Sequence, residues 1–263
     1  MLKPYLVYAK KSFLTKSVYR FDTLMNILST CLQIFILWGI YKALYSGNTE
    51  VDGITFGMVT TNFILSMGLS AGFTINEFYF PDKLGDGSIA TEMLRPISFP
   101  GRMLAENLGT AGFNLLFRFA PACFVAIMTI GIYPPASGAR FALFILSAIL
   151  GYGVLWTISY LTQMSAFWML NIWSVITIKN VFLNVLSGSM IPLWFMPDWI
   201  QGVIAYTPFS SIYFTPVQIY LGQLTNAEIV SKCLMQVVWI VVIYFLGSIL
   251  WRLGQRKIVV QGG

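Results

Sequence analysis

The sequence predicts an all-α polytopic membrane protein with six transmembrane helices, and three observations support this prediction. Of its 263 residues, 57% are hydrophobic and only 10% are charged, whereas about a quarter of the residues in a soluble domain are charged. No charged residue occurs between Arg140 and Lys179, and this stretch is long enough for two crossings at about 20 residues each. Most Lys and Arg residues flank apolar runs instead of forming one basic block, which argues against nucleic-acid binding.

The first segment, residues 1–21, is suited to the membrane surface. On a helical wheel, Leu2, Leu6, Ala9 and Phe13 share one face and lysines lie off it. We therefore expect an amphipathic interfacial helix. A plain basic tail in the cytosol is the alternative.

Six apolar segments follow, and each is expected to cross the membrane as a helix. They cover about residues 22–45, 54–75, 108–132, 141–161, 175–191 and 229–250. Residues 76–107 concentrate acidic and basic side chains and are too polar for lipid. Together these parts form a single transmembrane domain over residues 1–263.

Between the fifth and sixth apolar segments, residues 190–228 form an apolar region that prolines interrupt. Pro192, Pro197 and Pro208 make one continuous helix unfavourable, and aromatic residues such as Trp194 and Trp199 are typical of membrane interfaces. We expect short interfacial helices or a re-entrant helical hairpin here, before the last span.

The distribution of basic residues predicts the topology. Six crossings place both termini on one side, which is also the side of residues 76–107. Most basic residues fall on that side, and only Lys42, Arg140 and Lys232 fall on the other. The positive-inside rule then places both termini and residues 76–107 in the cytosol, and residues 190–228 outside.

Within the polar stretch, residues 85–96 have the pattern of a turn followed by a short helix. Glycines supply the turn, and a proline stops the helix. A short cytosolic helix between two spans can dock in a groove of a soluble partner and pass on its movement, although an ordinary solvated loop is the alternative. The residues expected to make this contact are Gly85, Asp86, Gly87, Ser88, Ile89, Glu92, Leu94, Arg95 and Pro96.

The order of these parts resembles the type-2 ATP-binding-cassette (ABC) permease family, in its six-span exporter form. The resemblance rests on Gly-Asp-Gly-Ser-Ile at residues 85–89, on Leu-Arg-Pro at residues 94–96, and on the proline- and tryptophan-containing segment at residues 187–200 with Tyr-Thr-Pro-Phe at residues 206–209. It implies that residues 85–96 are a coupling helix gripped by an ATPase.

The same resemblance implies the partners and the setting. Two separate ABC ATPase subunits would bind ATP and Mg²⁺, and a second permease subunit would complete a homodimer or a heterodimer in the plasma membrane, as in a bacterial inner membrane. The chain itself carries no glycine-rich loop ending in Gly-Lys-Ser/Thr, so hydrolysis is expected elsewhere. The expected cargo is an amphiphile, drug-like or peptidic, as in multidrug efflux.

Arg118 lies inside the third apolar segment, where a charge is costly and is usually held by a partner or a hydrated cavity. Asn114 lies one helical turn earlier, and Glu106 stands at the cytosolic end of the segment. These residues are expected either to brace the subunit or to line the transport pathway, with bracing favoured.

Two other classes of protein remain as alternatives. An ion-coupled secondary transporter usually keeps carboxylates inside its spans, whereas those of this chain lie near span ends. A lipid-modifying membrane enzyme needs clustered acids, metal ligands or an activated nucleophile, and the chain has no histidine. We therefore predict no catalytic residue and no metal site.

Overall fold

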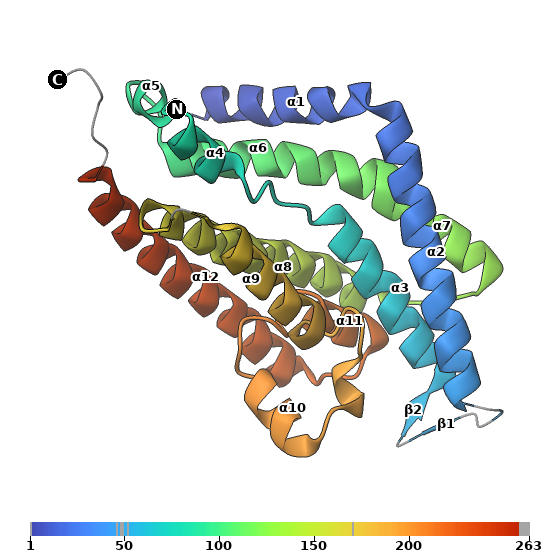
Figure 1. Cartoon of the computed structure of the whole chain (residues 1–263). Helices are drawn as coiled ribbons and strands as arrows, with labels where there is room; N and C mark the ends of the chain where they lie inside the picture. Colours follow the sequence, from blue (N-terminus) through green and yellow to red (C-terminus); the bar gives the residue numbers. More distant parts are fainter. Residues whose placement is uncertain (1, 46, 48–49, 52, 170, 258–263) are drawn as a thin grey trace.

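The computed structural model describes residues 2–45, 47, 50–51, 53–169 and 171–257. In this part of the chain the elements are helical, apart from one short antiparallel hairpin of strands β1 (Glu50–Val51) and β2 (Ile54–Thr55). The hairpin lies beyond the end of α2, at the opposite end of the molecule from α1 (Figure 1).

Among the described residues, four helices are long and apolar enough to cross a membrane. They are α2 (Arg20–Tyr45), the continuous helix Phe99–Thr129, the helix Gly138–Phe167 that begins with α8 (Gly138–Met164), and α12 (Asn226–Gln255). These helices agree with an all-α polytopic membrane protein.

Two of the six predicted spans correspond to shorter helices, α3 (Phe56–Gly72) and α9 (Trp173–Leu186). At about 1.5 Å per residue they extend about 25 and 21 Å, less than the roughly 30 Å of a hydrocarbon core. The count of six crossings therefore stays a prediction.

The helix of the third predicted span begins at Phe99, nine residues before the expected residue 108. Ser98 caps it by accepting a hydrogen bond from the N–H of Gly101 at 3.4 Å, and Pro100 suits the first turn. Where the membrane crossing begins stays a prediction, and the sequence does not indicate this earlier helix start, because Arg102 looked too polar for a membrane helix. Its charge is compensated by Glu92, so the helix runs through it.

This helix contains a π-helical turn, η1 (Leu115–Phe119), between α6 (Phe99–Asn114) and α7 (Ala120–Thr129). The N–H of Ala120 bonds to the carbonyl oxygen of Leu115, five residues back. Pro121 follows directly, and a proline within a helix lacks the N–H and crowds the carbonyl four residues before it. The wider turn accommodates the proline and carries Arg118 on its surface.

Helix α1 (Lys3–Val18) lies alongside α6 and then turns sharply into α2 (Figure 1). Its half-buried residues toward α6 are Tyr5, Tyr8, Ala9, Ser12 and Phe13, whereas Leu2 is 76% and Leu6 66% exposed. The tyrosines therefore provide much of the contact with α6, and the predicted placement of the face with Leu2 and Leu6 on the membrane surface stays a prediction.

Five short elements complete the described part of the chain. Two of them, between α3 and α6, are α4 (Tyr79–Gly85) and α5 (Ile89–Met93). The other three are η3 (Leu193–Phe195), α10 (Asp198–Ile204) and α11 (Phe214–Leu221), as expected for residues 190–228. α10 lies at the opposite end of the molecule from α4 and α5 (Figure 1).

Helix α8 forms the centre of the bundle and packs against both α11 and α12. Gly151 permits close contact with the chain just before α11, because an added Cβ would lie 2.5 Å from the carbonyl oxygen of Ile212. Gln236 of α12 is fully buried and donates hydrogen bonds to the carbonyl oxygens of Ser147 and Ser211 at 3.0 and 2.7 Å. A buried amide of this kind is affordable only when bonded.

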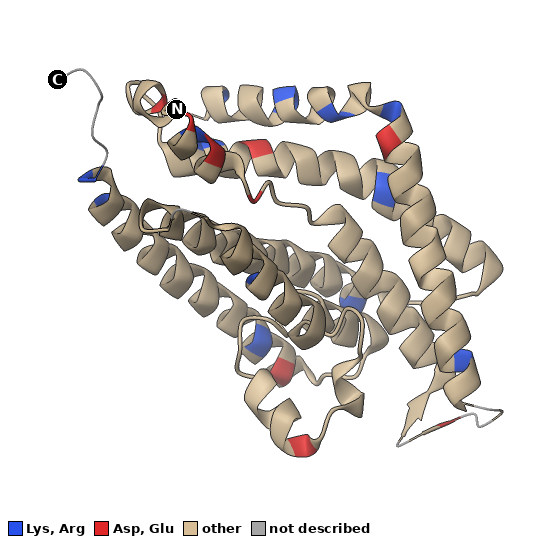
Figure 2. Ribbon diagram, in the orientation of Figure 1, with Lys and Arg blue, Asp and Glu red and all other residues tan. Residues whose placement is uncertain are grey.

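Charged residues gather at the two ends of the molecule (Figure 2). The start of α1, α4, α5 and the end of α12 share one end, and α10 and the start of α12 share the other. This separation leaves the middle of the bundle apolar apart from a few buried charges.

Candidate functional site

Helices α4 and α5 form a helix-turn-helix at the charged end of the molecule. α4 ends at Gly85, and Gly87, with a φ of +76°, turns the chain into α5. The carboxylate of Asp86 accepts a hydrogen bond from the N–H of Ser88 at 2.8 Å. Its hydrogen bonds with Ser88 hold the pKa of the exposed Asp86 carboxyl below its ordinary value. The predicted turn is present, and its glycine is required by the left-handed backbone.

The outer surface of this helix-turn-helix combines acidic and apolar side chains. Leu94 is 85% exposed and Met93 39% exposed, and Asp86 and Pro96 are also exposed. Ile89 points the other way and is 2% exposed within an apolar core that includes residues of α6 and α8. Leu94 therefore projects into solvent at the end of a short helix whose other side is buried, and an apolar side chain displayed in this way can dock in a groove of a partner protein. We call Asp86, Met93, Leu94 and Pro96 the exposed tip.

Glu92 lies beneath the exposed tip and holds together three cations. It pairs with Lys83 of α4 at 2.9 Å, with Arg95 at 3.1 Å, and with Arg102 of α6. Arg102 is 2% exposed, and its guanidinium also lies 5.4 Å from the ring centre of Phe99. Buried charges persist only when paired in this way.

The surroundings of Glu92 add to the role that we assign to it. Burial alone would raise the pKa of this carboxyl, but the hydrogen bonds and positive charges of Lys83 and Arg102 outweigh burial and leave the pKa below its ordinary value. The sequence predicted Glu92 as a contact for the ATPase. Its carboxylate faces inward and anchors the exposed tip to α6, and its contact with the ATPase stays a prediction.

Helix α1 is tied to the same cluster by two tyrosines. The hydroxyl of Tyr8 accepts a hydrogen bond from Arg95 at 2.9 Å, and that of Tyr5 accepts one from the N–H of Ser98 at 3.2 Å. The guanidinium of Arg102 lies 5.5 Å from the ring centre of Tyr8, within the range of a cation–π contact. α1, α5 and α6 therefore meet at one polar joint.

A second buried ion pair, which the sequence did not reveal, joins Glu77 to Lys179. Glu77 follows α3, and Lys179 is on α9; their side chains are 15% and 6% exposed. Ser159 of α8 donates a hydrogen bond to Glu77 at 2.9 Å and accepts one from Lys179 at 3.2 Å. A signal was available, because Lys179 falls inside an apolar segment predicted to span the membrane, where a charge needs a partner.

The chain between α3 and α4 is also fastened to α8 by an amide. Gln163 donates to the carbonyl oxygen of Asn76 at 3.1 Å and accepts a hydrogen bond from the N–H of Phe80 at 3.1 Å. Asn107 of α6 accepts from the N–H of Asn76 at 2.9 Å. The base of the helix-turn-helix therefore has fixed contacts with two long helices.

Arg118 and Asn114 lie on neighbouring turns and reach different helices. The Nε of Arg118 donates to the hydroxyl of Thr30 on α2 at 3.1 Å, and the amide of Asn114 donates to the hydroxyl of Thr74. Glu106, expected beside them, bonds instead with Tyr79 at 3.1 Å. These hydrogen bonds match the bracing role, and the position of Arg118 beside cavities also keeps the pathway role open.

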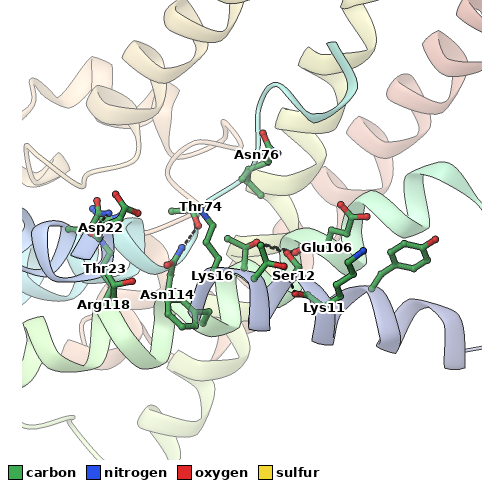
Figure 3. Close-up of a pocket in the computed structure, with 16 residues that line it drawn as sticks. Lys11, Ser12, Lys16, Asp22, Thr23, Thr74, Asn76, Glu106, Asn114 and Arg118 are labelled. Atoms are coloured by element: carbon green, nitrogen blue, oxygen red, sulfur yellow. Dashed lines mark hydrogen bonds between the residues drawn. The ribbon is translucent and has the colours of Figure 1, made fainter. Parts of the chain in front are cut away.

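Two cavities meet at Arg118. The first has a volume of about 670 Å³ and lies between α1, the start of α2, α6 and η1 (Figure 3). The second, of about 450 Å³, lies between α2, α3 and the chain after α9. Both volumes fall in the range of about 300 to 1,000 Å³ that is usual for ligand sites.

The region at the opposite end is held by its own contacts. Gln201 donates hydrogen bonds to the carbonyl oxygens of Trp194 and Met196 at 3.2 and 2.7 Å, and the rings of Trp194 and Phe214 pack edge to face at 5.1 Å. Trp199 is 74% exposed. Of the predicted prolines, Pro192 is buried, Pro208 is half-buried and Pro197 is exposed just before α10.

The long apolar helices, the helix-turn-helix with its exposed tip and the cavities beside the half-buried Arg118 belong to an α-helical membrane protein. The sequence profile of the family described as "ABC-2 family transporter protein" matches residues 27–262. The match covers most of the chain, so this protein belongs to that family, which confirms the predicted family. It is therefore a membrane permease subunit of an ABC transporter and works with separate ATPase subunits. No curated protein matches the chain in sequence.

Proposed function

We propose that this permease exports an amphiphile from the cytosol, and that the α4–α5 helix-turn-helix is the segment through which the ATPase drives it. One observation carries the proposal: Leu94 is 85% exposed, while the base beneath it is fixed by the buried pair of Glu92 and Arg102. An exposed apolar side chain on a firmly held segment can dock on a partner protein and pass the partner's movement to the helices that hold the segment.

In the proposed assembly, two permease subunits, identical or different, form the pathway and two ATPase subunits bind ATP and Mg²⁺. The permease lies in the plasma membrane, a bacterial inner membrane, with six crossings and both termini in the cytosol. The positions of the first turn of α1, the exposed tip and the end of α12 at one end of the molecule support this orientation (Figure 1). The distribution of basic residues also supports it.

The ion-coupled alternative has less support. Glu77 is the carboxylate that reaches into the bundle, and Lys179 neutralises it. A proton- or sodium-coupled carrier needs a carboxylate that exchanges its ion during transport. The family supplies a different energy source, a separate ATPase.

The test compares charge reversal at the two ends of the molecule. The variant Asp86→Lys changes the exposed tip, and its matched control Asp198→Lys changes an equally exposed aspartate at the start of α10. We expect Asp86→Lys and Leu94→Arg to lower copurification of the ATPase and ATP-driven uptake into inside-out vesicles, whereas Asp198→Lys leaves both unchanged.

The result is interpreted only for variants with matched abundance in the membrane. Normal ATPase binding and normal uptake by Asp86→Lys and Leu94→Arg together would refute the coupling role of the exposed tip. Uptake into right-side-out instead of inside-out vesicles would refute export.

A further inference from the structure

The cavity between α1, α2 and α6 is polar to a degree that membrane packing alone does not require. Hydroxyl and amide groups reach into it from all sides, from residues such as Ser12, Thr23, Asn26, Thr110 and Asn114. In Figure 3, Asp22, Thr23 and Arg118 lie at one end of this cavity and Lys11, Ser12 and Glu106 at the other. These groups are half-buried and already make hydrogen bonds within the chain, such as Ser12 with Thr110 at 2.9 Å, but a lining so rich in donors and acceptors also suits a polar ligand.

The charges of this first cavity do not balance. Lys11, Lys16 and Arg118 all line it, and within the described part of the chain none of them has a carboxylate within 4.0 Å. Of the two lining carboxylates, Glu106 is already engaged with Tyr79 at 3.1 Å, and it also lies 3.9 Å from Arg102. Even with both Asp22 and Glu106 ionised, three lining cations face two carboxylates, so the lining has an excess of positive charge and favours an anion.

The second cavity has a different character. Its lining is mixed: Ile36, Leu37, Ile40 and Met67 favour an apolar chain over water, and polar groups such as Thr30, Gln33 and Asn184 lie among them. Arg118 lines both cavities, so the polar compartment and the more apolar compartment meet at its guanidinium. A ligand that fills both must have a charged end and an apolar end.

We propose that the two cavities bind one amphiphile with a phosphate-bearing anionic head. The head lies between Lys11, Lys16 and Arg118, and the apolar chain extends past Arg118 between α2 and α3. Arginine and lysine together suit phosphate, because the guanidinium gives paired hydrogen bonds and the ammonium a compact charge. The inference rests on the proposed function, since it names the class of cargo that the permease carries.

The lysines of the cavity differ from those that merely attract a membrane surface. Lys3 and Lys10 of α1 are exposed and do not line the cavity, and they suit the anionic cytosolic leaflet. Lys11 and Lys16 line it together with Arg118. Lys10 therefore serves as a matched control, with the same charge on the same helix but outside the site.

The test measures binding to the purified permease–ATPase complex in a non-ionic detergent. Dodecyl phosphate is the probe, and dodecyltrimethylammonium and inorganic phosphate are the comparisons. We expect dodecyl phosphate to bind most tightly, and Arg118→Gln and Lys16→Gln each to weaken it about tenfold or more, as for the loss of a charge-assisted hydrogen bond. Arg118→Lys keeps the preference for the anionic head, and Lys10→Gln binds as the wild type does.

Three results would overturn the site. The first is that the anionic and cationic amphiphiles bind equally well. The second is that Lys10→Gln and Lys16→Gln lose the same amount of affinity for dodecyl phosphate. The third is that inorganic phosphate binds as tightly as dodecyl phosphate. Because Lys16 is exposed on α1, Lys16→Gln remains informative if Arg118→Gln does not fold.

A second arm separates cargo from resident lipid. The permease–ATPase complex is reconstituted into phosphatidylcholine vesicles that contain a tenth part of fluorescent phosphatidic acid or of dodecyl phosphate. ATP is then added. Movement of either anionic amphiphile that Arg118→Gln abolishes supports the cargo assignment, whereas tight binding without movement overturns it. If another compound is transported at the wild-type rate by Arg118→Gln, export stands and only this inference fails.

Discussion

The buried pair of Glu77 and Lys179 gives the sharpest test of the structure. Lys179→Met removes a charge whose side chain is 6% exposed and leaves Glu77, 15% exposed, without its counterion. The second carboxylate oxygen of Glu77 already lacks a hydrogen-bond partner among the described residues. Only the hydroxyl of Ser159 then remains to stabilise the carboxylate.

The expected size of the effect follows from this burial. Removing one partner of a buried ion pair costs about 3 to 5 kcal/mol, whereas replacing both partners by apolar or neutral groups is often close to neutral. At about 2 to 4 °C per kcal/mol for a chain of this size, Lys179→Met should lower the melting temperature by about 6 to 20 °C. The double variant Glu77→Gln with Lys179→Met should recover most of that loss.

The assay follows thermal loss of the monodisperse peak of the purified protein in detergent. Lys10→Met, which removes an exposed lysine of α1, is the control and should leave the melting temperature unchanged. A double variant that is no more stable than Lys179→Met alone would refute the reasoning, because the two side chains would then act independently.

Two further predictions concern the contacts around α6. The pKa of Glu92 lies below the value of 4.5 for a free glutamate. The ionised carboxylate therefore contributes fully to stability above about pH 4.5, and this contribution is lost as the pH falls through the lowered pKa. Glu92→Gln should flatten the acid side of a plot of melting temperature against pH, and an unchanged acid side would contradict this. Gly109→Ala should displace α1, since an added Cβ would overlap the carbonyl oxygen of Ala9, and should abolish cross-linking between cysteines placed at Ser12 and Thr110. Gly112→Ala is the control, because an added Cβ at that position meets only ordinary contacts, and cross-linking should survive it. Cross-linking that also survives Gly109→Ala would show that α1 and α6 do not touch at Gly109.

The sequence predicted the long apolar helices well, because their signal is local. The expected residues 22–45, 141–161 and 229–250 correspond to α2, α8 and α12, whose ends differ from the prediction by a few residues. The starts of α8 and α12 move outward because polar caps, Ser137 and Thr225, extend each helix beyond its apolar run. Thr225 and Glu228, for example, form a reciprocal capping box that starts α12 before the apolar residues begin.

The buried charges could not be placed in the same way. From the sequence alone, Arg102 was assigned to a cytosolic loop, because its pairing with Glu92 is apparent only in the structure. Glu77 and Lys179 are 102 residues apart in the chain. Such pairs depend on how helices pack, and one sequence without its fold does not specify the packing. The turn at Gly85 and Gly87 was predictable, because its chemistry is confined to neighbouring residues.

Helices α1 and α6 connect the surroundings of the exposed tip to the first cavity. α6 carries Arg102 near its start and leads to Arg118, about 24 Å further along at about 1.5 Å per residue. α1 bonds to Arg95 through Tyr8 and lines the first cavity through Lys11 and Lys16. If the ATPase binds the exposed tip and an amphiphile binds the first cavity, as we propose, each changes the affinity of the other by the same factor. Under these two proposals, α1 and α6 would couple the bound amphiphile to the ATPase without direct contact.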